Sequence, residues 1–125
     1  MADTYVYLIH EPDWDPEAYI PEAGGPEPAF AEHAAFAKAV AELGARIVGG
    51  AALNNSRFGG TVAPGQGERQ VEDAVWTDGP FTDSSEVITG FYMVETEDPD
   101  LAKRVAALVP TKGHIEWRKV FPTGM

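Results

Sequence analysis

The chain has no cysteine, few basic residues and no long apolar run. Without cysteine it can form neither disulfides nor thiolate, iron–sulfur or cysteine–zinc sites. Its nine lysine and arginine residues against twenty aspartate and glutamate residues give a formal net charge of −11. That charge would repel phosphate backbones, so we expect no nucleic-acid partner. No segment approaches the roughly 18 apolar residues of a membrane span, so no membrane partner is expected either.

What the sequence does contain is typical of a globular protein. Its 125 residues fit one domain spanning residues 1–125, and 44% of them are hydrophobic. The N-terminus lacks the basic stretch and apolar run of a signal peptide, so we expect a cytoplasmic protein. The acidic surface is typical of a soluble protein, and it would also suit a partner protein with a basic surface.

The first half of the chain predicts a strand, a loop, a helix and a second strand. Residues 4–10 are rich in β-branched and aromatic types and predict a central strand. Five prolines between positions 12 and 28 exclude regular structure until a helix begins at about residue 27. That helix is expected to end at Gly44 and to carry one stripe of Phe30, Ala34, Ala37 and Ala41 beside another of Phe36, Val40 and Leu43. Residues 46–53 predict the second strand, with close backbone packing at Gly49-Gly50.

The second half predicts a hairpin, a strand, a helix and a last strand. The hairpin arms are expected at residues 58–63 and 71–77, the next strand at 87–95 and the last strand at 114–121. Asp98-Pro99 is a typical helix start, and Pro110 should stop that helix after residue 109. Without the hairpin the order is βαββαβ, which predicts an α+β, ferredoxin-like fold. Two helices would cover one sheet face only, so we expect a homodimer to cover the other.

Two stretches carry a resemblance to a known family. One contains Asp78-Gly79-Pro80-Phe81, followed by Glu86-Val87-Ile88 and Gly90-Phe91-Tyr92. The other runs from His33-Ala34-Ala35-Phe36 through Leu43-Gly44-Ala45 to Gly49-Gly50 and Leu53. With these motifs the chain resembles the YCII-related superfamily, specifically its DGPF-domain branch, over almost its whole length. The resemblance implies a dimeric α+β barrel in which two ferredoxin-like units pack sheet to sheet.

The resemblance also implies a pocket with a candidate histidine–aspartate acid–base pair. His33 matches the helical histidine of the superfamily, and Asp78 matches the aspartate of the tetrapeptide. In the YCII branch the aspartate lies near the end of the second helix, where this chain has Val109-Pro110-Thr111. Many DGPF sequences carry a lysine before the glutamate matched by Glu86, whereas this chain has Ser85. Most members of the family have no assigned substrate, and the gene setting of some implies a regulatory or accessory role.

Both candidate catalytic residues also have a structural interpretation. His33 lies among Phe30, Ala34 and Ala37 on a helical face that we expect to meet the sheet. There it would act either as a partly desolvated base or as a core histidine held by one hydrogen bond. Asp78 begins an Asp-Gly-Pro sequence, in which aspartate commonly bonds its own backbone and fixes a turn. Asp78 could fix this turn and also serve as the aspartate of the acid–base pair.

The remaining candidates define no further site. His10 with Glu11 and Asp13 has the atoms of a metal site but no recognised spacing, so no metal is expected. The glycine pairs lack the context of phosphate-binding loops, and no cofactor is expected. Three hypotheses stay open: a module that binds a small molecule or a protein, a cofactor-independent enzyme using His33 and Asp78, and a structural subunit of a larger assembly.

Overall fold

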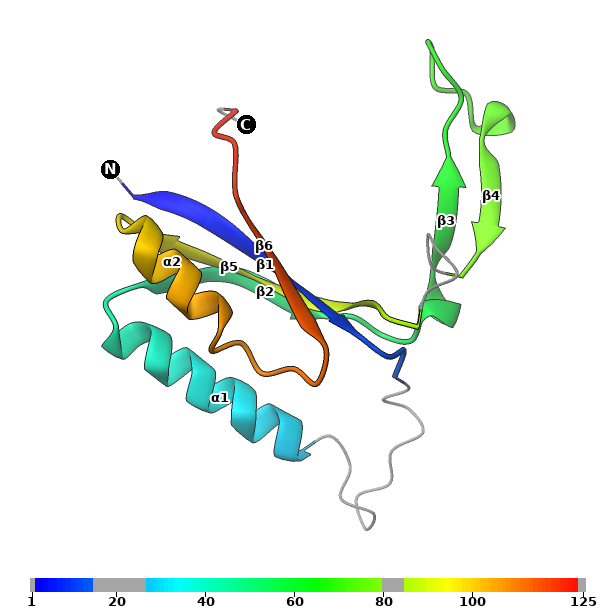
Figure 1. Cartoon of the computed structure of the whole chain (residues 1–125). Helices are drawn as coiled ribbons and strands as arrows, with labels where there is room; N and C mark the ends of the chain where they lie inside the picture. The colour runs from blue at the N-terminus through cyan, green and yellow to red at the C-terminus, as the bar shows by residue number, and fades with distance from the viewer. Residues whose placement is uncertain (1, 15–26, 80–84, 124–125) are drawn as a thin grey trace.

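The computed structural model describes residues 2–14, 27–79 and 85–123. Within them, four antiparallel strands form one sheet in the order β2-β5-β1-β6, and two further strands form a separate hairpin (Figure 1). The strands are β1 (Asp3–Glu11), β2 (Arg46–Ala52), β3 (Gly60–Ala63), β4 (Val75–Asp78), β5 (Val87–Thr96) and β6 (His114–Lys119). The helices are α1 (Glu27–Glu42) and α2 (Pro99–Ala106).

This order confirms the ferredoxin-like α+β fold with an added hairpin. β1 lies between β5 and β6, as its apolar sequence predicted. Both helices cover the same face of the four-stranded sheet (Figure 1). In the described part of the chain, no helix has the length and hydrophobicity needed to cross a membrane.

The core lies between the helices and this covered face. Tyr5, Tyr7 and Ile9 alternate along β1 and are buried, as the two-residue period of a strand requires. Tyr7 is 0% exposed, and its hydroxyl donates a 2.7 Å hydrogen bond to the carbonyl of Ala102 in α2. Burial, with a smaller contribution from Tyr5, raises the pKa of the Tyr7 phenol to about 12. The first strand is therefore joined to the second helix by a buried polar contact.

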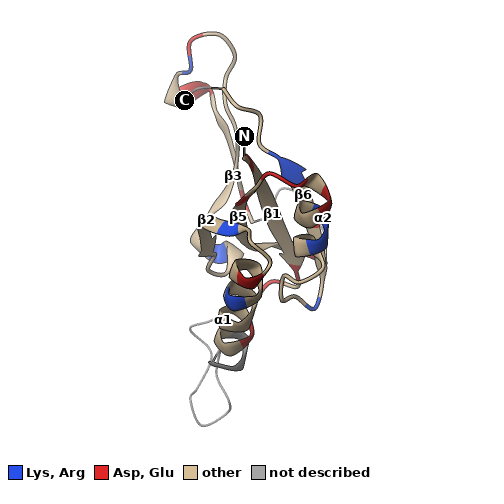
Figure 2. Ribbon diagram, turned by 90° about the vertical axis from the view of Figure 1, so that its left-hand side faces the viewer, with Lys and Arg blue, Asp and Glu red and all other residues tan. Residues whose placement is uncertain are grey.

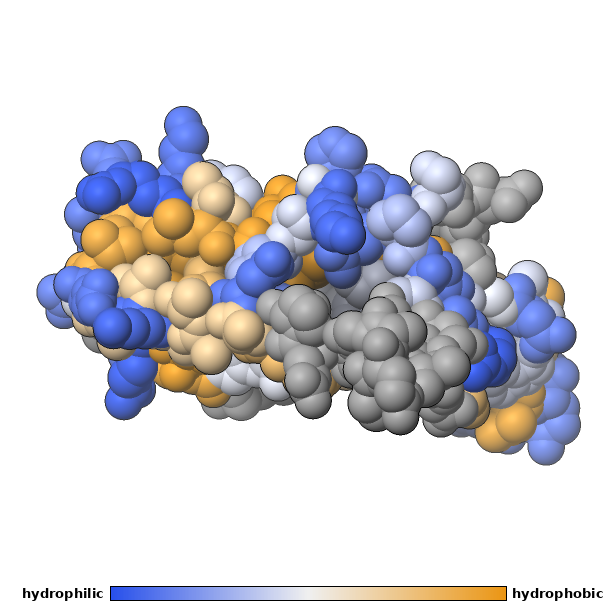
Figure 3. Space-filling model, turned by 90° about the horizontal axis from the view of Figure 1, so that it is seen from below, coloured by the Kyte–Doolittle hydropathy of each residue, from blue (hydrophilic) through white to orange (hydrophobic). Residues whose placement is uncertain are grey.

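The buried stripe of α1 differs from the expected one. The expectation that Phe30, Ala34 and Ala37 meet the sheet was wrong: all three are exposed, Phe30 by 57%. Phe36 and Val40 are buried instead, because large side chains fill the space against the sheet better than alanine. Figure 3 shows hydrophobic surface left exposed on the side where α1 lies, bordered by hydrophilic side chains.

Two glycines allow β2 and β5 to approach closely. Gly50 has a φ of +156°, and a Cβ placed there would lie 2.8 Å from the carbonyl oxygen of Phe91. A Cβ at Gly90 would lie 2.9 Å from the carbonyl oxygen of Ala51. The close packing predicted for this part of β2 is thus confirmed, and it determines how near Tyr92 comes to β2.

The hairpin is shorter than predicted and extends away from the sheet (Figures 1 and 2). Single turns of 3₁₀ helix lie at the start of each expected arm: η3 (Ser56–Phe58) ends at the first residue of the first arm, and η4 (Val71–Asp73) takes the first three residues of the second. Only β3 and β4 pair, with Val62 opposite Trp76 and Gly60 opposite Asp78. Trp76 is 69% exposed, so the hairpin leaves a large aromatic side chain uncovered.

The second helix begins as predicted and ends early. Asp98 caps it by accepting a hydrogen bond from the backbone N–H of Asp100, and Pro99 takes the first helical position. The regular helix stops at Ala106 rather than at Val109, although Val109 is buried in the core. β6 likewise stops at Lys119 rather than at residue 121.

The second face of the sheet carries no helix. Because side chains alternate along a strand, Val6 and Leu8 of β1 point to this face, opposite Met93 and Phe91 of β5. All four are only half-buried. We call these four residues the open sheet face.

Candidate functional site

His33 lies on α1 and contacts the sheet through Tyr92. Its Nδ1 atom is 2.7 Å from the Tyr92 hydroxyl, and the two ring centroids are 5.7 Å apart. Phe36, three residues further along the same helical stripe, packs its ring 4.8 Å from that of Tyr92. Tyr92 is therefore covered by two consecutive members of the stripe, and His33 is half-buried as a result.

The environment of Tyr92 determines what this pair can do. Burial raises the pKa of the Tyr92 phenol, so the hydroxyl keeps its proton at neutral pH. A neutral phenol can either donate to Nδ1 or accept from an Nδ1–H group. When it accepts, the Nε2 atom of His33 is unprotonated and can take a proton, and the resulting imidazolium keeps its bond to Tyr92. Tyr92 thus orients the imidazole, which is the role expected of Asp78.

From the sequence, Tyr92 was named only within the Gly90-Phe91-Tyr92 stretch and was given no role in the site. A signal for its role was present, because Tyr92 alternates with Gly90 and Val94 along the strand predicted over residues 87–95. That alternation places it on the same sheet face as Val94, which is buried under the helices. Its contact with His33 could not be predicted in this way, because that contact depends on how α1 packs against β5.

Asp78 is the last residue of β4, and its side chain is exposed. Gly79, which follows it, has a φ of +87°, and its carbonyl accepts a 2.9 Å hydrogen bond from the Thr61 hydroxyl. A positive φ is a conformation that glycine adopts readily in turns. Among the described residues no hydrogen bond or ion pair joins Asp78 to His33. Pro80 and Phe81, which complete the tetrapeptide, lie outside the described residues.

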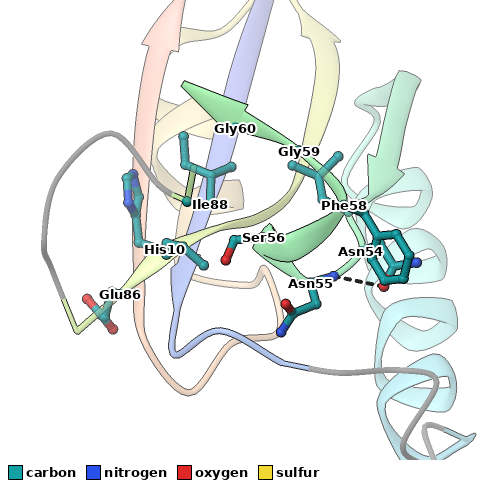
Figure 4. Close-up of a pocket in the computed structure, with 12 residues that line it drawn as sticks. His10, Asn54, Asn55, Ser56, Phe58, Gly59, Gly60, Glu86 and Ile88 are labelled. Carbon is teal, nitrogen blue, oxygen red and sulfur yellow. Dashed lines mark hydrogen bonds between the residues drawn. The ribbon is translucent and has the colours of Figure 1, made fainter. Parts of the chain in front are cut away.

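A cavity of about 520 Å³ opens where the hairpin leaves the sheet (Figure 4). Gly79, next to Asp78, contributes to its lining, and His33 does not. The lining comes from the end of β1, the segment after β2, the base of the hairpin and the start of β5. Trp14 supports this region, because its indole N–H donates a 2.8 Å hydrogen bond to the carbonyl of Leu53. Trp14 thus anchors the segment after β1 to the segment after β2.

The other two histidines form pairs with glutamates at the same end of the sheet. His10 on β1 faces His114 on β6 in the strand register. The Nε2 atom of His10 lies 3.1 Å from Glu116, and the Nδ1 atom of His114 lies 2.8 Å from Glu86. Hydrogen bonds from Arg118 and then from His10 lower the pKa of the Glu116 carboxyl, so it is ionised at neutral pH.

The group considered for a metal is divided by the fold. Glu11 accepts hydrogen bonds from Thr89 and Thr111, while Asp13 accepts them from Ser56. Within the ranges that the structure describes, no three histidine or carboxylate side chains gather as metal ligands.

The fold and the paired side chains define an α+β protein of the ferredoxin-like class. Residues 21–123 match the family model of the YCII-related domain. The chain therefore belongs to the YCII-related family. A search of curated proteins found no match.

Proposed function

We propose that this YCII-related protein binds a small organic metabolite beside His33, with Asp78 as a second contact. The observation that carries the proposal is the 2.7 Å hydrogen bond between His33 and Tyr92. It fixes the imidazole while leaving the side chain half-exposed, so the Nε2 atom is available to a ligand. A regulatory or accessory role in the cytoplasm is part of this proposal.

The two residues enter the proposal on different grounds. His33 is supported by its own geometry and by the neutral phenol that orients it. Asp78 is supported by the DGPF resemblance; the cavity beside Gly79 does not support it, because His33 does not line that cavity. Among the described residues, the exposed carboxylate of Asp78 makes no hydrogen bond to His33. We therefore expect it to contact the ligand rather than the imidazole.

The alternative is a cofactor-independent enzyme in which His33 moves a proton on the bound molecule. The observation in its favour is the neutral state of the Tyr92 phenol beside His33. Because Tyr92 stays neutral, His33 can accept a proton at Nε2 without a second charge forming beside it. Proton transfer on a small carbon acid or hydroxyl compound fits this arrangement, and Asp78 would stabilise the imidazolium across the ligand.

We further propose that the protein is a homodimer whose copies pack through the open sheet face. The apolar side chains Val6, Leu8, Phe91 and Met93 would be covered by their counterparts in a second copy, as in other ferredoxin-like dimers that pack sheet to sheet. The exposed hairpin aromatic Trp76 supports the same conclusion.

Thermal-shift screening of a metabolite library tests the binding proposal. The proteins to compare are the wild type, His33→Ala and Asp78→Asn. A compound that raises Tm of the wild type but not of His33→Ala would place the ligand beside His33 and identify its class. Loss of the shift in Asp78→Asn would add Asp78 to the site. If every active compound stabilises all three proteins equally, the proposal is wrong. Incubating any compound found with the wild type and following it by NMR separates binding from turnover.

A further inference from the structure

We propose that the cavity at the base of the hairpin is a second ligand site, specific for a neutral ring compound whose hydroxyl donates a hydrogen bond to Nδ1 of His10. This site is separate from the one beside His33. His33 projects from α1 onto the covered sheet face, whereas His10 follows Val6 and Leu8 onto the other face. The inference therefore does not depend on the ligand site proposed beside His33; it does require that the cavity stay open in the proposed dimer, because His10 lies on the same sheet face as Val6 and Leu8.

The tautomer of His10 follows from its partner. Glu116 accepts hydrogen bonds from both Arg118 and His10, and its carboxylate is ionised. An ionised carboxylate can only accept, so the Nε2 atom of neutral His10 must carry the proton. The Nδ1 atom then holds a lone pair, and among the described residues it has no hydrogen-bond partner. His10 is thus held as an oriented acceptor, in the way a carboxylate orients an imidazole in many functional sites.

The cavity that His10 lines has the size and lining of a small-molecule site. Its volume of about 520 Å³ lies within the usual range of roughly 300 to 1,000 Å³. Leu53, Phe58 and Ile88 supply apolar wall. Figure 4 shows Phe58, Ile88 and His10 among the residues that line the cavity. Such a lining favours the faces of a ring over an extended polar chain.

The other polar groups of the lining are largely engaged in the fold. The side-chain amide of Asn55 donates to the carbonyl of Trp14 and its oxygen accepts from the backbone N–H of Arg57. The hydroxyl of Ser56 donates to Asp13. These bonds fix the segment after β2 and leave His10 as the oriented acceptor of the cavity.

The charges around the cavity select against anions. Glu86 lines it, and Glu116 lies directly behind His10. Arg118 is already bonded to the Glu116 carboxylate. Among the described lining residues there is no lysine or arginine, so a carboxylate or phosphate ligand would meet this negative field, whereas a neutral hydroxyl compound would be less affected by it.

The test uses p-cresol, a neutral ring with one hydroxyl, and compares it with benzoate and toluene. Binding would be followed by NMR at about pH 8, where histidine and phenol are both largely neutral. We expect saturable shifts of p-cresol at the residues of the cavity, at least tenfold weaker binding of toluene and no saturable binding of benzoate. Binding of benzoate as strong as that of p-cresol would overturn the inference.

Two variants form a matched pair. His10→Leu removes the acceptor and retains bulk, and we expect it to weaken p-cresol binding at least tenfold. His33→Leu makes the same change on the other face of the sheet, at a residue that does not line the cavity, and should leave binding unchanged. Equal effects of the two variants, or no effect of His10→Leu, would contradict the site. His33→Ala should bind p-cresol like the wild type, so failure of this site and failure of the site beside His33 can be told apart.

A measurement on the wild type removes any dependence on how the variants fold. In the imidazole ¹⁵N spectrum, neutral His10 should show the proton on Nε2, and p-cresol should shift the Nδ1 resonance. If His10 instead carries its proton on Nδ1, it cannot accept from the ligand, and the inference is wrong.

Discussion

The Nδ1 atom of His33 and the hydroxyl of Tyr92 lie 2.7 Å apart although 59 positions separate the two residues in the chain. The bond connects α1 to β5, the strand that also pairs with β1 and β2. It therefore ties the candidate site to the centre of the sheet, and the properties of that site depend on how well the sheet is formed.

Removing the Tyr92 hydroxyl should weaken the fold through the loss of this bond. We expect Tyr92→Phe to lower the free energy of unfolding by about 1 kcal/mol, the usual net contribution of one hydrogen bond. Urea denaturation of the wild type, His33→Ala, Tyr92→Phe and the double variant completes a mutant cycle. A coupling energy near zero would show that the two side chains do not interact in solution.

Stability should fall in alkaline solution because of Tyr7. The folded-state pKa of about 12 lies above the ordinary value of 10.0, so the unfolded chain loses this proton first as the pH rises. The stabilisation is complete below about pH 10 and is lost towards pH 12, with a total effect on the order of 2 kcal/mol. Urea denaturation at several alkaline pH values should show this decline, and Tyr7→Phe should show a shallower one. An equally steep decline in Tyr7→Phe would assign the effect to other groups.

Gly50 should tolerate no side chain. A Cβ there would lie 2.8 Å from the Phe91 carbonyl oxygen and 3.1 Å from a ring carbon of Tyr92, at a φ that side chains rarely adopt. We expect Gly50→Ala to cost about 2 kcal/mol of stability and to disturb the His33–Tyr92 contact. Gly59→Ala is the matched control, because a Cβ at Gly59 meets no atom within 4 Å. Similar melting curves for the two variants would contradict the clash.

A charge placed on the open sheet face should separate the proposed dimer. Met93 lies opposite Val6 in the register of that face, so Met93→Glu would bury a carboxylate between two copies. Size-exclusion chromatography with light scattering should give a dimer for the wild type and a monomer for this variant. Phe30→Glu on the exposed side of α1 is the control and should remain dimeric. A monomeric wild type would refute the dimer directly.

The elements of the fold were predictable because they rest on local patterns. The capping pair Asp98-Pro99, the terminating Gly44 and the alternation in β1 each act within a few residues. The hairpin arms were overestimated, because the first residues of each predicted arm, residue 58 and residues 71–73, lie in turns of 3₁₀ helix instead of pairing. A strand needs a partner, and residues 71–73 have none in the described hairpin.

The side-chain pairs of the site could not be predicted from local sequence patterns. His33 was singled out from its position in a helix, but its contact with Tyr92 depends on which stripe of α1 meets the sheet. Two stripes were available, and the one that contains Phe36 packs against the sheet, whereas the one that contains Phe30 is exposed. The pair of His10 and Glu116 spans 106 positions and exists only because β1 and β6 are neighbours. The pairing of His33 with Asp78 in one ligand site stays a prediction.

The central place of β1 has a consequence for biosynthesis. Within the described residues, β1 pairs with β5 and β6, which are synthesised long after it. Until then its apolar side chains have no sheet to join, and the long loops to be closed slow the search for partners. Folding of this sheet must therefore wait until β5 has been synthesised, so a chain truncated before β5 should be a substrate for chaperones and proteases rather than a partly folded protein.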